Sequence, residues 1–190
     1  MNLLSGPPRS FSTERLVISR GERRDAHDLY AAARESIEQA HPFLPWCHPD
    51  YVIAESKAWL GLVAREWRAD SAYSFVIRDQ HGRLIGGCGI NRIGDGYIGN
   101  LGYWIRSTEI GRGYATEAAM GLARYGFAAL KLGRIEFVMS VRNGASRAVA
   151  KRCGARYEGE MRNALLLHGA YHNAHLYGLI SGDLTPMQSS

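Results

Sequence analysis

Hydrophobic and polar positions follow two periods along this chain, and the segments that carry them alternate. The period of two that is typical of strands is clearest at 134–141, where Ile135, Phe137 and Met139 alternate with polar or smaller residues. Extended runs bounded by turn residues predict further strands at 15–20, 71–78, 84–93 and 97–105, then a hairpin of 155–167 with 170–181. Spacings of three and four predict helices over 24–38 and 51–69, from Gly113 to about 130, and from Asn143 to Gly154.

The segment from Gly102 to Ala118 joins a strand, a glycine-containing turn and the start of a helix. Such an arrangement favours anion binding, because the first helical N–H groups lack partners and the helix dipole attracts negative charge. Gly111 and Gly113 leave no side chain between the backbone and a bound phosphate. Two glycines alone also fit a simple tight turn. The segment is neither a Walker loop nor a dinucleotide fingerprint, since the required Gly-Lys-Ser/Thr and the third glycine are absent.

A second motif follows the strand at 134–141. Asn143 and Ser146 are both suited to cap the short helix that comes next, and Gly154 is suited to end it. The order of the two motifs, a glycine turn before one helix and an Asn/Ser cap before the next, is more specific than either motif alone.

These two motifs resemble those of the Gcn5-related N-acetyltransferases (GNAT superfamily). Gly111-Arg-Gly-Tyr-Ala115 is similar to the acetyl-CoA pyrophosphate loop, and Asn143-Gly-Ala-Ser146 with Gly154 is similar to the next conserved block. Over residues 12–182 the chain resembles the Rim-type (RimJ/RimL-like) branch, which acetylates N-termini of ribosomal proteins. The further matching segments are Thr13-Glu-Arg-Leu-Val17, Phe43-Leu-Pro-Trp46, Leu84-Ile-Gly-Gly with Asn91-Arg-Ile93, and Gly169-Ala-Tyr-His with Leu176-Tyr177.

The resemblance implies an α/β (α+β) fold of GNAT type. We expect a mixed, mostly antiparallel twisted sheet of about seven strands, with a central parallel pair that splays apart and helices on its flanks. Residues 12–182 would form this single domain, after a flexible segment at 1–11 and before a tail at 183–190. Phe43, Leu44 and Trp46 either plug the core or wall a substrate cleft.

The resemblance also implies acetyl-CoA as co-substrate, with no metal. The pantetheine arm would pair with the backbone of Trp104, Ile105 and Arg106, and Asn143 would contact the arm or a bound water. Ser146 would donate to the departing thiolate, a role compatible with capping a helix. The pyrophosphate would lie on the loop Gly111, Arg112, Gly113, Tyr114 and Ala115. Family loops often carry Gln or Arg where this chain has Ile110, but the backbone amides do not depend on that side chain.

The general base is the least defined part of the predicted site. Close ribosomal members carry a glutamate where this chain has Leu165, and Asn173 and Ala174 stand where the branch often has Asp and His. Glu160 is the named candidate, although a regular strand would turn it to the face opposite Leu165. An N-terminal amine needs only a mild base, because its reference pKa is about 7.7–8.0. The remaining polar candidates are Glu158, Tyr103, Glu136, His168, His172 and His175.

Composition narrows the class of protein. The 190 residues suit one domain, and the formal net charge of +5 fits a polyanionic cofactor but lacks the dense basic clusters of a nucleic-acid-binding protein. Cys47, Cys88 and Cys153 have no zinc or redox spacing, so we expect free thiols in a reducing cytoplasm. The chain has no 18-residue apolar run, so no membrane span is expected, and Met1–Ser10 is not typical of a secretory signal.

The leading hypothesis is therefore an acetyl-CoA-dependent N-acetyltransferase that acts on a protein N-terminal α-amine by direct attack in a ternary complex. One alternative acceptor is a small amine, such as an aminoglycoside or a polyamine; it ranks second because the sequence has no acidic cluster to bind a polycation. A second alternative is an acyl-CoA-binding regulatory module with little catalysis. The last strands are a candidate surface for a homodimer.

Overall fold

The computed structural model describes residues 6–184, which form one sheet flanked by helices. The first half contains β1 (Ser10–Ser12), β2 (Leu16–Arg20), the 3₁₀ turn η1 (Arg23–Asp25), α1 (Ala26–Glu35), α2 (Ile37–Ala40), α3 (Ile53–Arg68), β3 (Ala72–Asp79) and β4 (Leu84–Ile93). The second half contains β5 (Ile98–Ile105), η2 (Ser107–Glu109), α4 (Tyr114–Ala128), β6 (Arg134–Ser140), α5 (Gly144–Arg152), β7 (Arg156–Leu167), β8 (Ala170–Leu179) and η3 (Ser181–Asp183).

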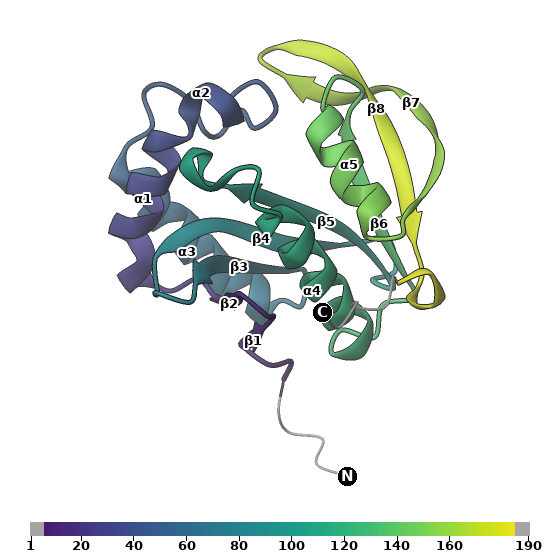
Figure 1. The fold of residues 1–190 in the computed structure, drawn as a ribbon, viewed down its shortest axis with the longest axis horizontal. Helices are drawn as coiled ribbons and strands as arrows, with labels where there is room; N and C mark the ends of the chain where they lie inside the picture. Colours follow the sequence, from purple (N-terminus) through teal and green to yellow (C-terminus); the bar gives the residue numbers. More distant parts are fainter. Residues whose placement is uncertain (1–5, 185–190) are drawn as a thin grey trace.

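The eight strands lie in the order β1-β2-β3-β4-β5-β6-β8-β7 (Figure 1). All neighbouring pairs are antiparallel except β5 and β6, which are parallel. The predicted fold class, a mostly antiparallel mixed sheet with one central parallel pair, is confirmed. The strand count is eight instead of about seven because Ser10–Ser12 pairs with Val17–Ser19.

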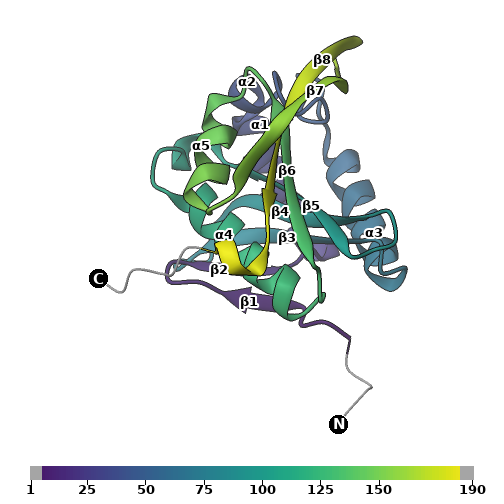
Figure 2. The same ribbon diagram turned by 90° about the vertical axis from the view of Figure 1, so that its right-hand side faces the viewer.

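Helices cover both faces of the sheet, with α1 and α3 on one side and α4 and α5 on the other (Figures 1 and 2). The larger core cluster lies under α4, where Leu122 packs with strand residues such as Phe75 and Ile90. A smaller cluster lies under α1 and α3, built around Leu29 and Leu60. Each face of the sheet therefore has its own apolar core. The parallel pair of β5 and β6 belongs to the sheet that separates these two cores.

Two local predictions needed correction. The helix expected over 24–38 is interrupted at Ser36, because the Ser36 hydroxyl donates to Ala32 O at 2.7 Å and accepts from Ser107 N at 3.1 Å. The N-terminal segment expected to be flexible up to residue 11 is ordered from the start of β1. The rest of that segment up to residue 5, and residues 185–190 of the predicted tail, lie outside the described residues.

The glycine run in β4 allows a close approach between strands. A Cβ atom at Gly86 would overlap the carbonyl oxygen of Trp104 on the neighbouring strand β5. Gly86 therefore lets β5 lie tightly against β4 at the point where β5 approaches its end.

Candidate functional site

The parallel strands β5 and β6 stay paired over only three residue pairs, from Ile98 with Arg134 to Asn100 with Glu136. Beyond them the strands part, and a cavity of about 1120 Å³ opens between 101–105 and 137–140. The α1–α2 segment, the glycine turn before α4, the start of α5 and Leu165 of β7 complete its wall. The main lining residues are Ser36, Gln39, Ala40, Phe43, Leu44, Leu101, Tyr103, Trp104, Ile105, Gly111, Gly113, Tyr114, Ala115, Thr116, Ser140, Asn143, Ser146 and Leu165.

The backbone of β5 presents alternate residues to this opening. Arg106 N donates to Ile85 O at 2.8 Å, so the backbone groups of Arg106 face β4. Because hydrogen-bonding direction alternates along an antiparallel strand, those of Trp104 also face β4, and those of Tyr103 and Ile105 face the opening. This parity corrects the predicted segment Trp104 to Arg106: of those three residues, only Ile105 can offer backbone groups to a ligand arm in the gap.

The glycine turn ends in a helix start whose amides are free. Gly111 and Gly113 have φ of 84° and 82°, a conformation that other residues adopt at a cost. The first backbone bond of α4 runs from Glu117 N to Gly113 O at 3.1 Å. Within residues 6–184, the amides from Gly111 to Thr116 have no protein acceptor. The predicted anion site therefore has the required donors, and they border the cavity.

A carboxylate in the first turn of α4 holds this turn against the N-terminal strands. Glu117 Oε1 accepts from Thr13 Oγ1 at 2.6 Å and from Arg15 N at 2.7 Å, and Glu117 Oε2 accepts from Arg15 Nε at 2.7 Å. Arg15 also donates to Arg112 O at 3.0 Å and lies over the Tyr114 ring. Glu117 had no role in the predicted site; the signals that could have revealed it are its place in the first helical turn and the Thr-Glu-Arg motif.

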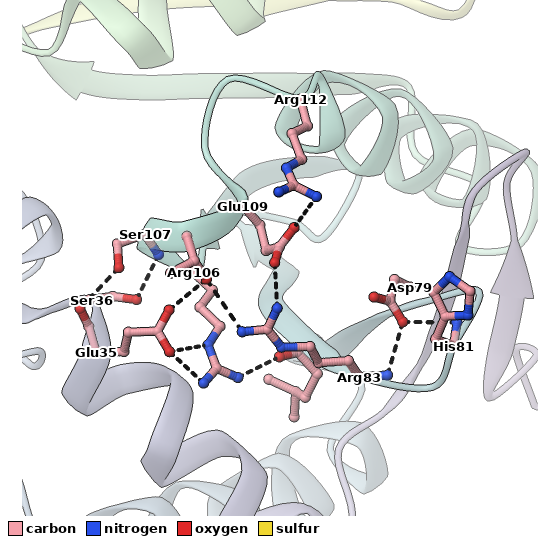
Figure 3. A network of polar contacts seen from close by, with 11 residues as sticks. Glu35, Ser36, Asp79, His81, Arg83, Arg106, Ser107, Glu109 and Arg112 are labelled. Atoms are coloured by element: carbon pink, nitrogen blue, oxygen red, sulfur yellow. Dashed lines mark hydrogen bonds and ion pairs between the residues drawn. The ribbon is translucent and has the colours of Figure 1, made fainter.

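The side chain of Arg112 is held by an acidic partner (Figure 3). Glu109 is buried and bridges two arginines, at 2.6 Å from Arg83 Nη1 and 3.2 Å from Arg112 Nη1. The Arg112 side chain does not line the cavity and is 61% exposed. Any charge that Arg112 gave to a phosphate would therefore compete with its ion pair to Glu109.

The end of β5 is fixed to the end of α1 by a second network (Figure 3). Glu35 accepts from Arg106 Nε at 2.6 Å and from Thr108 Oγ1 at 2.6 Å, while Ser107 Oγ donates to Glu35 O at 2.9 Å. The Arg106 hydrogen bond is the main cause that lowers the pKa of Glu35 to about 2. The Arg106 side chain is thus a structural clamp between strand and helix.

The start of α5 brings two predicted residues to the cavity. Asn143 is the N-cap, and its Oδ1 accepts from Ser146 N at 3.0 Å, as expected for a capping residue. The Tyr103 hydroxyl is buried and has no hydrogen-bond partner within the described part of the chain. Burial raises the pKa of Tyr103 to about 12, and the nearby Ser146 hydroxyl opposes that rise without a hydrogen bond of regular geometry.

The candidate base Glu160 is not brought to the cavity. Its Oε1 accepts from Asn173 Nδ2 at 2.6 Å, and its Oε2 lies 3.9 Å from His175 Nε2. Leu165 lines the cavity instead, with His172 directly opposite it on β8. The pairing of β7 with β8 is irregular at Met161/Leu165, but Glu160 pairs with His175 and Leu165 with His172, an odd number of residues apart on both strands. Glu160 and Leu165 therefore lie on opposite faces, as the alternation of a regular strand predicts.

The other acid–base candidates are also placed elsewhere, apart from Tyr103. Glu136 and Glu158 both form ion pairs with Arg134. His168, at the tip of the β7–β8 hairpin, bonds to His41 O at 2.8 Å and so ties the hairpin to the segment after α2. Among residues 6–184, the only carboxylates that line the cavity are Glu14, Glu109 and Glu117, and the last two are held by arginines.

Within 6–184, no His, Cys, Asp and Glu side chains gather in a group of three or more that could hold a metal ion. The three cysteines are free thiols and all are buried. None of the described helices is long and apolar enough to cross a membrane.

The chain is similar in sequence to known acetyltransferases. Residues 15–156 match the acetyltransferase (GNAT) domain family. The ribosomal-protein-serine acetyltransferase of Escherichia coli (strain K12) is 32% identical over 175 residues, which cover 90% of this chain and 94% of that protein. YdaF of Bacillus subtilis (strain 168) is 38% identical over 80 residues, but these span only 44% of its length. Three further Bacillus relatives are matched over 61% to 65% of theirs.

Solved structures share the fold. RimJ of Mycobacterium smegmatis, determined in complex with CoA-disulfide, superimposes with a TM-score of 0.82 at 24% identity, covering 92% of this chain and 85% of that one. The family match covers well over half of the sequence, and it includes the glycine turn, the parted strands and the α5 cap. The chain therefore belongs to the GNAT acetyltransferase domain family.

Proposed function

We propose that this protein transfers the acetyl group of acetyl-CoA to the α-amine of a protein N-terminus. One observation carries the proposal: the amides from Gly111 to Thr116, which have no acceptor among residues 6–184, border a cavity that continues between the parted strands β5 and β6. The amides supply an anion site, and the cavity supplies room for an extended arm that ends between the strands. In acetyl-CoA a diphosphate is joined to a thioester by such an arm.

The residues present fit acetyl-CoA along its length. The amides of the glycine turn would hold the diphosphate, and the backbone of Tyr103 and Ile105 would pair with the pantetheine arm as an added strand. The thioester end would then reach the start of α5, where Ser146 lies. When bound, the coenzyme supplies an acetyl group already activated as a thioester.

The chain's own groups would perform two electrostatic tasks. A backbone N–H of β5 in the gap would donate to the acetyl oxygen, and one well-aimed donor of this kind is worth about 3 kcal/mol in the transition state. The Ser146 hydroxyl would donate to the sulfur as the C–S bond breaks. Both groups are held by regular structure, β5 by its pairing with β4 and Ser146 by the Asn143 cap.

The acceptor side of the cavity favours an uncharged segment. Its wall is formed by Ser36, Gln39 and Ala40 with the apolar side chains Phe43, Leu44 and Leu165. The carboxylates of Glu109 and Glu117 are already bound by arginines, so they do not offer the acidic site that a polyamine or an aminoglycoside needs. A peptide N-terminus whose first residues are small and neutral suits this wall. Such an acceptor, together with three free thiols, fits the cytoplasmic location expected from the sequence.

The acceptor amine would lose its proton to water instead of to a dedicated base. Among the described residues, no imidazole lines the cavity, and Leu165 occupies the wall where the close ribosomal members carry a glutamate. Since the reference pKa of an α-amine is about 7.7–8.0, roughly a fifth of the amine is already neutral at about pH 7.2. The enzyme would therefore bind the neutral amine directly.

The proposal is tested by measuring acetyl-CoA binding and then turnover with a panel of acceptors. At a hundredfold excess over Kd, acetyl-CoA should stabilise the protein by about 2.7 kcal/mol, and a missing thermal shift at millimolar acetyl-CoA would refute the proposal. Thiol release should then be seen with peptides that begin with Ser, the residue in the name of the Escherichia coli ribosomal-protein-serine acetyltransferase, or with Ala, the residue in the name of a second Escherichia coli relative, the ribosomal protein uS5 alanine N-acetyltransferase. Three controls test other acceptors. One is the same set of peptides with a blocked N-terminus and an internal lysine. The other two are the polyamine spermidine and the aminoglycoside kanamycin. Turnover with the controls alone would reassign the acceptor, and binding without turnover would indicate a regulatory module.

A further inference from the structure

The large cavity extends beyond the glycine turn. Along α4 it is lined by Thr116, Met120 and Arg124, which follow one another at intervals of four residues and so share one face of the helix. Along α5 the lining residues continue to Arg152, the last residue of that helix. The cavity therefore continues as a groove that is walled by both helices.

The end of α5 lies beside the first turn of α4. Cys153, which follows Arg152 in the chain, has its Sγ atom 4.0 Å from Thr116 O. Thr116 is the last residue of the segment whose amides form the proposed diphosphate site. Arg152 is thus next in sequence to a residue that contacts this segment, and it lines the same cavity as the amides.

Arg152 is a cation without a protein partner. Its side chain is exposed, and its guanidinium forms no hydrogen bond or ion pair with residues 6–184. The helix α5 carries no carboxylate that could neutralise it. Arg147 and Lys151 of the same helix are also exposed and unpaired within that range, but neither lines the cavity. Its position, more than its charge, therefore distinguishes Arg152 from its neighbours.

We propose that Arg152 binds the 3′-phosphate of the coenzyme and thereby makes the site prefer coenzyme A to its dephospho form. This inference rests on the proposed function. Coenzyme A has two anionic groups, the diphosphate and a phosphate monoester on the ribose that follows it. The amides of the glycine turn would hold only the first. The monoester carries a charge of about −1.5 to −2 at pH 7, and a planar guanidinium can bind two phosphate oxygens at once.

The groove also offers an apolar surface for the adenine ring. Met120 of α4 and Ala148 of α5 line it, and both are half-buried. A methionine thioether makes favourable contacts with aromatic rings. Adenine packed on these two side chains would lie in the same groove as Arg152, and Arg124 adds a second positive charge to its wall.

The inference is tested by comparing coenzyme A with 3′-dephospho-coenzyme A, which lacks only this phosphate. Isothermal titration calorimetry at low salt should show that the wild-type protein binds coenzyme A about five- to tenfold more tightly than the dephospho form. Arg152→Gln should abolish this preference by weakening the binding of coenzyme A alone. Unchanged affinity for the dephospho form shows at the same time that the variant is folded. Arg152→Lys keeps the charge but not the planar group, so it should retain part of the preference.

Lys151→Gln is the matched control. It removes a charge from the same last turn of α5, and with it a similar interaction with the helix dipole, but Lys151 does not line the cavity. This variant should keep the wild-type preference for coenzyme A.

Three results would overturn the inference and leave the proposed function intact. The first is equal affinity of the wild-type protein for the two coenzymes. The second is an equal loss of affinity for both in Arg152→Gln, which would assign the arginine to the diphosphate or to the fold. The third is a lost preference in Lys151→Gln, which would indicate a diffuse positive potential. Failure of the wild-type protein to bind either coenzyme would overturn both proposals.

Discussion

Arg15 Nε donates to Glu117 Oε2 at 2.7 Å and joins two segments that are 102 residues apart in the chain. Through this bond the turn between β1 and β2 is fixed to the first turn of α4. The adjacent bond from Arg15 to Arg112 O fixes the glycine turn itself. The amides of the proposed diphosphate site are thus held by contacts that use none of their own donors.

Glu117→Ala should loosen this turn. It leaves three donor groups of Thr13 and Arg15 without their acceptor, and because Arg15 is 40% exposed we expect a loss of about 1–2 kcal/mol of unfolding free energy. Urea unfolding should show this loss, and titration with coenzyme A should show weaker binding. Asp50→Asn, a change of an exposed carboxylate, is the matched control. Full stability and affinity in Glu117→Ala would show that the clamp contributes nothing.

Replacing Gly113 should impair the same site through the backbone. Gly113 has φ of 82°, and a Cβ there would lie 3.3 Å from Arg15 Nη2, so Gly113→Ala should cost about 1 kcal/mol of stability and weaken coenzyme binding. Gly61→Ala is the control: that glycine lies in α3 with open space around its Cβ, so the substitution should stabilise by a similar amount. Thermal unfolding of both variants measures the two changes in stability. Changes of the same sign would contradict the prediction.

Stability should depend on pH through Glu35. The hydrogen bond from Arg106 lowers its pKa from 4.5 to about 2, so the ionised carboxylate stabilises the folded state above about pH 4.5. That contribution falls as the pH drops from 4.5 toward 2. Glu35→Gln should therefore cost roughly 1–3 kcal/mol at pH 7, and the difference from wild type should narrow below pH 4.5.

Urea unfolding of wild type and Glu35→Gln between pH 7 and pH 3 measures this difference. Glu38→Gln, an exposed neighbour on α2, is the control and should track wild type throughout. A difference that stays constant over this pH range would rule out the Arg106 interaction as its source.

The pH dependence of catalysis should follow the acceptor. Without a base in the cavity, kcat/KM should rise with pH and level off at the pKa of the acceptor's own amine, about 7.7–8.0 for a peptide. For two peptides whose N-terminal amines differ in pKa, the midpoints of the kcat/KM profiles should differ by the difference between the two pKa values. His172→Ala, which alters the residue opposite Leu165, should leave that midpoint in place. A midpoint of the kcat/KM profile that stays the same for all acceptors and is lost in His172→Ala would identify an enzymatic base.

The sequence predicted those parts of the molecule that depend on local pattern. The strand at 84–93 and the helix within 51–69 form as expected, because period and turn residues act over a few positions. Buried Glu109 and the clamp at Glu117 were missed, since their partners Arg83 and Arg15 are distant in sequence. The register of β5 and the irregular pairing of β7 are tertiary properties as well. The register of β5 decides that Ile105 faces the gap, whereas the orientation of Glu160 away from the face of Leu165 follows from strand alternation alone.

The most direct test of the central claim uses backbone amide spectra of the ¹⁵N-labelled protein. On addition of coenzyme A, and separately of ADP, the amide signals of Gly111, Arg112, Gly113, Tyr114, Ala115 and Thr116 should shift to lower field, whereas pantetheine should affect Tyr103 and Ile105 and leave the turn unchanged. If coenzyme A binds while the signals of the turn stay in place, the diphosphate is held elsewhere and the proposed mode of acetyl-CoA binding is contradicted.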